Sequence, residues 1–157
     1  MTRFVLALIR LMALALSYLL STLTAAAFIT FALFLGGDAQ WLQNDPEVVV
    51  GSIGFTFAVW FEISRVLFVP FVLYVLIAEP ARLSGLVINL AAGGLFALVY
   101  MIMTPYTFDL PYSGQQIWTA ALAAGFVGGF AHWVFAGGRA GRWLGPRSTS
   151  TSVRNPQ

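Results

Sequence analysis

The chain contains no cysteine, a single histidine and few charged residues. Charged side chains make up 9% of its 157 residues, against about 25% in soluble domains. Without cysteine it has no disulfide framework, thiolate metal site or cysteine nucleophile. One histidine among scattered acids offers few ligands, so we expect no metal and no cofactor. No phosphate-binding glycine loop or serine–histidine–aspartate set occurs either, and we therefore expect no catalytic residues and no enzymatic activity.

What the chain has in abundance is hydrophobic sequence, at 59% of all residues. Four apolar runs reach the roughly 20 residues that span a bilayer as a helix: residues 4–35, 48–78, 83–104 and 117–136. They lack the alternation of barrel strands, and hydrocarbon leaves unpaired backbone groups unsatisfied, so helices are expected. The sequence predicts an all-α integral membrane protein, with four transmembrane helices in an antiparallel up-down bundle of two hairpins. The connections are too short to hold a soluble domain.

The basic residues predict how the helices are oriented. All eight are arginines, and seven flank the predicted spans at alternate connections: Arg3, Arg10, Arg82, Arg139, Arg142, Arg147 and Arg154. The other two connections carry acids only: Asp38, Asp45, Glu47 and Asp109. Since cytoplasmic loops carry the excess of basic residues, both termini are expected in the cytoplasm. Arginine without lysine is typical of a GC-rich genome, which favours a bacterial cytoplasmic (inner) membrane.

Residues 137–157 follow the last span and contain spaced arginines, a tryptophan and a serine- and threonine-rich stretch. This composition predicts a cytoplasmic, largely disordered tail whose arginines attract anionic membrane lipids. We do not expect nucleic acid as a partner, because arginines beside a membrane have this simpler role.

A charged pair interrupts the second apolar run. Glu62 and Arg65 are three residues apart and can pair on one helix face. Arginine at a bilayer centre costs about 2.5–3.5 kcal/mol, so we expect the pair to face protein or water. Pro70 predicts a kink close to the charges. Three hydroxyl residues of the first run, Ser17, Ser21 and Thr24, are expected opposite the pair as its support.

Two interpretations of this polar group remain open. It can be a satisfied network that fixes helix packing. Alternatively, Glu62 can carry protons or bind a cation, or Arg65 can bind an anionic group.

Small residues at four-residue spacing mark the third and fourth runs. Such stripes let two helix backbones approach closely, and counting along both helices places Gly93 level with Gly125. The predicted seam consists of Gly85, Asn89, Gly93, Ala97, Ala121, Gly125, Gly129 and His132. We expect Asn89 and His132 to share a hydrogen bond. A second stripe of small residues in the fourth run, which includes Ala124 and Gly128, could serve a further helix.

Our first hypothesis is a small non-enzymatic protein that acts by lateral association in the membrane, as an accessory subunit, assembly factor or scaffold. Its partners would be membrane lipids and another membrane protein or further copies of itself. The alternative is a small oligomeric channel or transporter that uses Glu62 and Arg65. A lipid-modifying enzyme built on His132 and Asn89 is a third, less favoured interpretation.

Overall fold

A computed structural model of the chain describes residues 3–35, 46–104 and 114–141. These residues form helices and no strand: α1 (Arg3–Leu35), α2 (Pro46–Ala81), α3 (Leu86–Met103), α4 (Gly114–Phe135) and a short 3₁₀ helix, η2 (Gly137–Arg139). Four of the helices are long and apolar enough to cross a membrane. The all-helical fold class predicted from the apolar runs is therefore confirmed for the described part of the chain.

The predicted helix bounds agree with the observed ones to within three residues, and two of the three largest differences lie at the turn between α2 and α3. Arg82 has a left-handed φ of 57°, and the Leu83 N–H donates to the Ala78 carbonyl at 2.9 Å. This closing bond is typical of a Schellman turn, in which glycine usually takes the left-handed position. Helix α2 consequently runs to Ala81, and α3 begins at Leu86.

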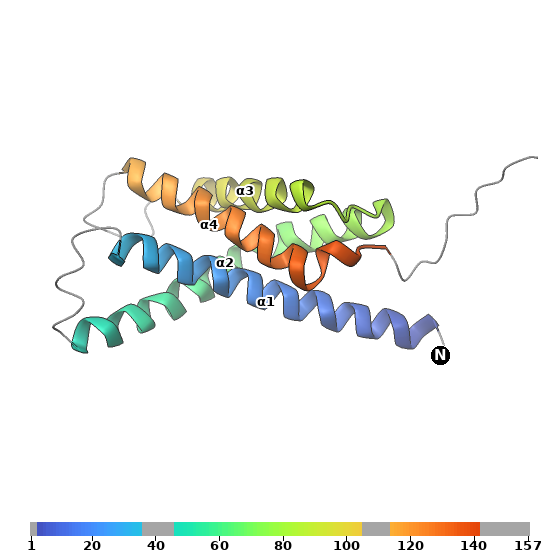
Figure 1. The fold of residues 1–157 in the computed structure, drawn as a ribbon, viewed down its shortest axis with the longest axis horizontal. Helices are drawn as coiled ribbons and strands as arrows, with labels where there is room; N and C mark the ends of the chain where they lie inside the picture. Colours follow the sequence, from blue (N-terminus) through green and yellow to red (C-terminus); the bar gives the residue numbers. More distant parts are fainter. Residues whose placement is uncertain (1–2, 36–45, 105–113, 142–157) are drawn as a thin grey trace, which may run out of the picture.

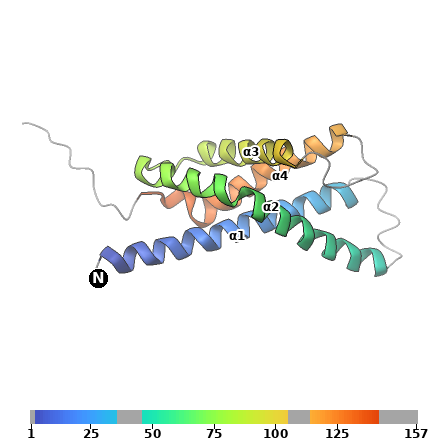
Figure 2. The same cartoon turned by 180° about the vertical axis from the view of Figure 1, so that it is seen from behind.

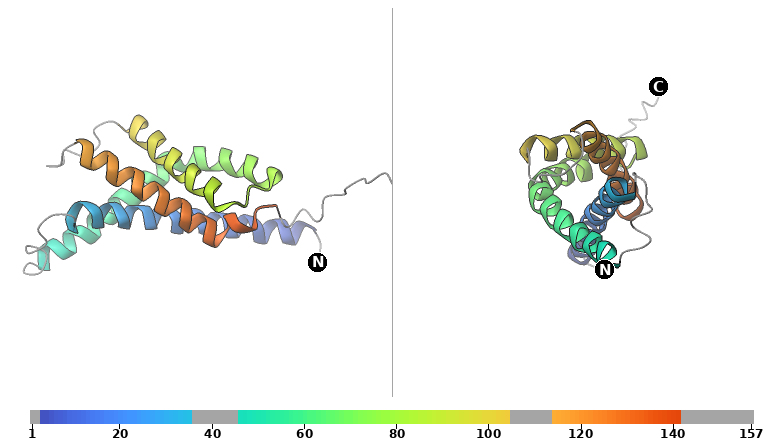
Figure 3. Two further views of the ribbon diagram at one scale, coloured as in Figure 1. Left: turned by 45° about the horizontal axis from the view of Figure 1, so that its top comes forward. Right: turned by 90° about the vertical axis from the view of Figure 1, so that its left-hand side faces the viewer.

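Helix α4 lies between α1 and α3 and packs against both (Figure 1). Helix α2 packs mainly on α1 and has weaker contact with α3. It is bent near its middle (Figure 2), the region that holds Pro70. Figure 3 shows that the beginning of α1, the end of α2 and η2 share one end of the molecule, which we call the polar end.

The interior between α1 and α2 is built from aliphatic side chains: Ala26, Val59, Ile63 and Leu67. Many large apolar side chains point outward instead; Phe4, Val87 and Ile102 are 76%, 77% and 71% exposed. An apolar exterior of this kind is typical of helices that face lipid.

The predicted tail begins with a short folded segment. Residues 137–141 are folded, and Gly137, Ala140 and Gly141 are buried. This segment is ordered because the chain turns back against the end of α2, where the Gly141 N–H donates to Glu79. The rest of the predicted tail, residues 142–157, lies outside the described residues.

Candidate functional site: a polar cluster and an outward charged pair

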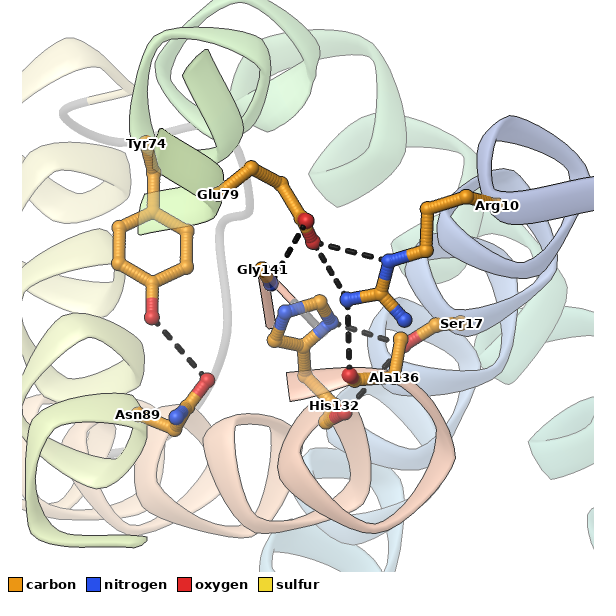
Figure 4. Close-up of polar contacts among 8 residues, drawn as sticks. All are labelled: Arg10, Ser17, Tyr74, Glu79, Asn89, His132, Ala136 and Gly141. Atoms are coloured by element: carbon orange, nitrogen blue, oxygen red, sulfur yellow. Dashed lines mark hydrogen bonds and ion pairs between the residues drawn. The ribbon is translucent and has the colours of Figure 1, made fainter. Parts of the chain in front are cut away.

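Polar side chains from all four long helices gather at and near the polar end (Figure 4). The cluster consists of Arg10 and Ser17 from α1, Tyr74 and Glu79 from α2, Asn89 from α3 and His132 from α4. Each of these side chains has a hydrogen-bond partner. Two backbone groups, at Ala136 and Gly141, complete the cluster.

An ion pair between Arg10 and Glu79 joins the beginning of α1 to the end of α2. The Arg10 Nε donates to Glu79 Oε1 at 3.0 Å, and both side chains are only 12% exposed. Arg10 also donates to the Ala136 carbonyl at 3.0 Å, while Glu79 Oε2 accepts the backbone N–H of Gly141 at 3.0 Å. The ion pair therefore holds α1, α2 and the segment after α4 together.

In the sequence Arg10 served only as a signal for the orientation of the helices, and Glu79 was not singled out. The sequence does contain a signal for Glu79 as a functional residue. Glu79 is an acid at the end of the second apolar run, at the membrane side where the arginines are expected. A buried carboxylate there requires a cation, and Arg10 lies in the facing run.

Ser17 and His132 form a second contact, between α1 and α4. The Ser17 Oγ lies 2.8 Å from His132 Nδ1 and also donates to the His132 carbonyl at 3.4 Å. Ser17 is completely buried and His132 is 7% exposed. A hydroxyl with no exposed surface cannot meet a substrate as a nucleophile, so this serine–histidine pair has the geometry of a packing contact.

The predicted hydrogen bond between Asn89 and His132 is not formed. Asn89 Oδ1 accepts instead from the Tyr74 hydroxyl at 3.0 Å, and its amide donates to the Gly85 carbonyl at 2.8 Å. The prediction was wrong because counting residues gives the height of a side chain but not its direction around the helix. Tyr74 reaches Asn89 from α2, and His132 turns towards Ser17.

A cavity of about 70 Å³ lies between the helices next to this cluster, and Tyr74, Asn89 and His132 of the cluster line it. Its polar side chains are those of Tyr18, Ser21, Thr22, Tyr74, Asn89, Tyr100 and His132, and the other side chains of the lining are apolar. A space of this size holds a few water molecules. No group of three or more metal-binding side chains occurs among the described residues.

Glu62 and Arg65 form the expected ion pair within α2, with Arg65 Nε at 3.0 Å and Nη2 at 2.7 Å from the carboxylate oxygens. The Arg65 side chain is 65% exposed at the surface of the chain, and that of Glu62 is 20% exposed. Neither residue lines the cavity between the helices. The pair faces outward because the opposite side of α2, with Val59 and Ile63, supplies the contact with α1.

The hydroxyl residues of α1 consequently do not support the charged pair, and this prediction was wrong. Ser17 binds His132, Ser21 donates to the Gly128 carbonyl at 2.7 Å, and Thr24 donates to its own helix at Leu20. Other hydroxyl groups of α1 bond α2, among them that of Thr22. Thr22 Oγ1 accepts from Trp60 and from Ser64, each at 3.1 Å.

The glycine seam between α3 and α4 lies where the depth count predicts. A methyl group added at Gly93 would lie 2.2 Å from the Gly125 carbonyl oxygen, and one at Gly129 would lie 2.4 Å from that of Asn89. Ala97 and Ala121 are buried in the same region, whereas Gly85 is exposed at the start of α3.

The second small-residue stripe of α4 is occupied as well. Ala124 is 1% exposed, and Gly128 lies against Ser21 and Ala25 of α1. Both stripes of α4 are therefore used inside the molecule, one for α3 and one for α1.

No known protein family matches the sequence, and no curated protein or solved structure is similar to it.

Proposed function

We propose that this chain is a small non-enzymatic protein of a bacterial cytoplasmic membrane that acts by lateral association, as an accessory subunit, assembly factor or scaffold. The observation that carries the proposal is the outward direction of the Glu62–Arg65 pair. Both residues lie near the middle of the candidate span Val50–Ala81, the depth at which a bilayer is least polar.

Charged groups at that depth are costly when lipid surrounds them. Arginine costs about 2.5–3.5 kcal/mol at a helix centre, and charged residues within spans almost always face protein or a water-filled cavity. Pairing Arg65 with Glu62 reduces the net charge but leaves other guanidinium N–H donors for a further acceptor, because a guanidinium has five. A protein surface packed over α2 would supply such a partner.

The packing of α4 supports the same proposal. Helices α1 and α3 already pack against its two small-residue stripes. Neither stripe is therefore available to a helix of another protein. The outward surface of α2 is then the favoured place for association.

In this proposal the helices cross as two antiparallel hairpins, with both termini and the turn between α2 and α3 in the cytoplasm. Cysteine labelling tests this topology, because the chain has no cysteine of its own. Ser84 is exposed between the second and third candidate spans, and Gln115 is exposed at the start of the fourth. We expect Ser84→Cys to react with a membrane-impermeant maleimide only after the cells are opened, and Gln115→Cys to react in intact cells. The reverse pattern would contradict the topology.

Extraction of the full chain in native lipid nanodiscs, followed by native mass spectrometry, tests lateral association. We expect a particle larger than one chain, and we expect Glu62→Gln combined with Arg65→Gln to reduce its abundance. Leu95→Ala is the matched control, because Leu95 is an exposed side chain of α3 and should leave the assembly intact. Single chains alone would contradict lateral association, and ion flux in liposomes that Glu62→Gln abolishes would favour a channel.

A further inference from the structure

One face of α2 combines small residues with the charged pair. Gly54, Ala58, Glu62 and Arg65 follow one another at helical spacing and therefore share a side of the helix. Gly54, Ala58 and Arg65 are exposed, and Glu62 is partly so. We call these four residues the α2 outer face.

The glycine on this face has no role inside the molecule. A methyl group added at Gly54 would meet no atom within 4 Å. By contrast, methyl groups at Gly93, Gly125 and Gly129 would collide with a neighbouring helix. Glycine within a helix is less stable than alanine by about 0.5–1 kcal/mol, and a close approach by another backbone is a physical reason to keep it. Gly54 and Ala58 have the small-xxx-small spacing that brings membrane helices together.

The charges on the same face are self-complementary. The face carries one acid and one base, so the partner it fits best also presents one base and one acid, a turn apart. A second copy related by a two-fold axis meets this condition, because in such an interface each contact occurs twice in reciprocal form. Glu62 of each copy then accepts a hydrogen bond from Arg65 of the other. The donors of Arg65 that its own helix does not use gain an acceptor in this way.

We infer that the partner is a second copy of this chain, and that two copies pack through the α2 outer face in the plane of the membrane. The inference rests on the proposed lateral association and names its partner. Two copies inserted in the same direction have a two-fold axis along the membrane normal, so the two α2 helices run parallel. They cross at Gly54 and Ala58, and the longer charged side chains bridge them beyond the crossing point.

The surface beside the face has room for such a partner. A groove of about 770 Å³ runs between α1 and α2, and Phe61, Phe68 and Arg65 contribute to its walls. Aromatic side chains of the second copy can enter this groove. A lipid acyl chain is the competing occupant, and the experiments below separate the two.

Disulfide cross-linking in the membranes of the expressing cells tests the inference. In a parallel dimer Ala58 of one copy lies close to Ala58 of the other, so Ala58→Cys should give a covalent dimer under mild oxidation. Ala27→Cys is the matched control. Ala27 is also exposed. It lies on α1 at nearly the depth of Ala58, because Thr30, one helical turn after Ala27, bonds Thr56 of α2. We expect no dimer from the control.

A charge-exchange experiment tests the reciprocal ion pairs. Glu62→Arg and Arg65→Glu, each placed in the Ala58→Cys background, put like charges opposite each other in a homodimer, so each should lose its cross-link. Co-expression of the two variants, with different affinity tags, should restore a cross-linked heterodimer. If a reversed charge prevents insertion, the neutral double variant Glu62→Gln with Arg65→Gln serves instead. Two polar contacts, each worth about a factor of three in a membrane, predict about tenfold weaker dimerisation for it.

Several results would overturn the inference. Equal cross-linking at Ala58 and Ala27 would indicate random collision. Absence of the Ala58 dimer from an assembly that contains a different protein would reject the second copy and leave lateral association in place. Absence of that dimer together with single chains in nanodiscs would reject both the second copy and lateral association. A lipid that stays bound to these single chains would identify the acyl chain as the occupant of the groove.

Discussion

A single methyl group at Gly93 tests the packing between α3 and α4. The added atom would lie 2.2 Å from the Gly125 carbonyl oxygen and 2.9 Å from the Gly129 Cα, whereas ordinary contact begins at 3.4 Å. The shortfall to the nearer atom is 3.4 − 2.2 = 1.2 Å. Both obstructing atoms belong to backbone and cannot rotate away, so the two helices must separate.

The cost of that separation can be worked from the contacts. A gap of about 1 Å loses up to half of the dispersion energy of the atom pairs that it parts, and overpacked cores lose about 1–3 kcal/mol. We place Gly93→Ala at the upper end of this range. The better helix propensity of alanine, about 0.5–1 kcal/mol, offsets part of the loss. The expected net decrease in the free energy of unfolding is about 2 kcal/mol.

Two further glycine variants serve as controls for Gly93→Ala. A methyl group at Gly94 would lie 2.7 Å from the ring of Phe126, a half-exposed side chain that can turn aside, so Gly94→Ala should cost less than about 1 kcal/mol. At Gly114 no atom lies within 4 Å, and Gly114→Ala should leave stability unchanged. Unfolding in increasing SDS mole fraction, followed by tryptophan fluorescence, measures all three. A Gly93→Ala protein as stable as the parent chain would refute the close seam.

The remaining predictions concern the polar cluster. Glu79→Ala leaves the largely buried Arg10 without its counter-ion and should lower the free energy of unfolding by about 3 kcal/mol. The double variant Arg10→Met with Glu79→Leu should recover most of this loss. A full double-mutant cycle in the same SDS assay checks both, and additive effects would contradict the ion pair. Tyr74→Phe removes the only donor to Asn89 Oδ1 among the described residues and should cost about 1–2 kcal/mol. An unchanged unfolding midpoint would show that water replaces the hydroxyl.

Much of the fold could be predicted because bilayer thickness fixes the length of an apolar helix. The glycine seam was equally accessible, since only small residues let two backbones approach, and they identify a contact face directly. Counting 1.5 Å per residue then sets the heights of Gly93 and Gly125. Height and contact face together were sufficient to pair these two helices.

The side-chain partners could not be predicted because they depend on the angle around each helix axis. Apolar side chains suit both lipid and protein neighbours, so the periodicity of α2 does not say which side faces α1. Glu62 and Arg65 were therefore expected opposite the hydroxyl residues of α1, whereas Arg65 lies on the outer surface of α2 at 65% exposure and Glu62 beside it is 20% exposed. Because the angle around each helix axis was unknown, Asn89 was also paired with His132. In the structure Asn89 bonds Tyr74, and His132 bonds Ser17.

The proposed association requires that protein, and not lipid, covers the Glu62–Arg65 surface of α2 in the membrane. Spin labels at Ala58→Cys and Ala27→Cys test it directly, because collision with oxygen dissolved in the acyl chains reports contact with lipid at each site. We expect the label at Ala58 to be shielded from oxygen, while the label at Ala27, at nearly the same depth, collides with oxygen freely. Equal and high collision rates at both sites would contradict it.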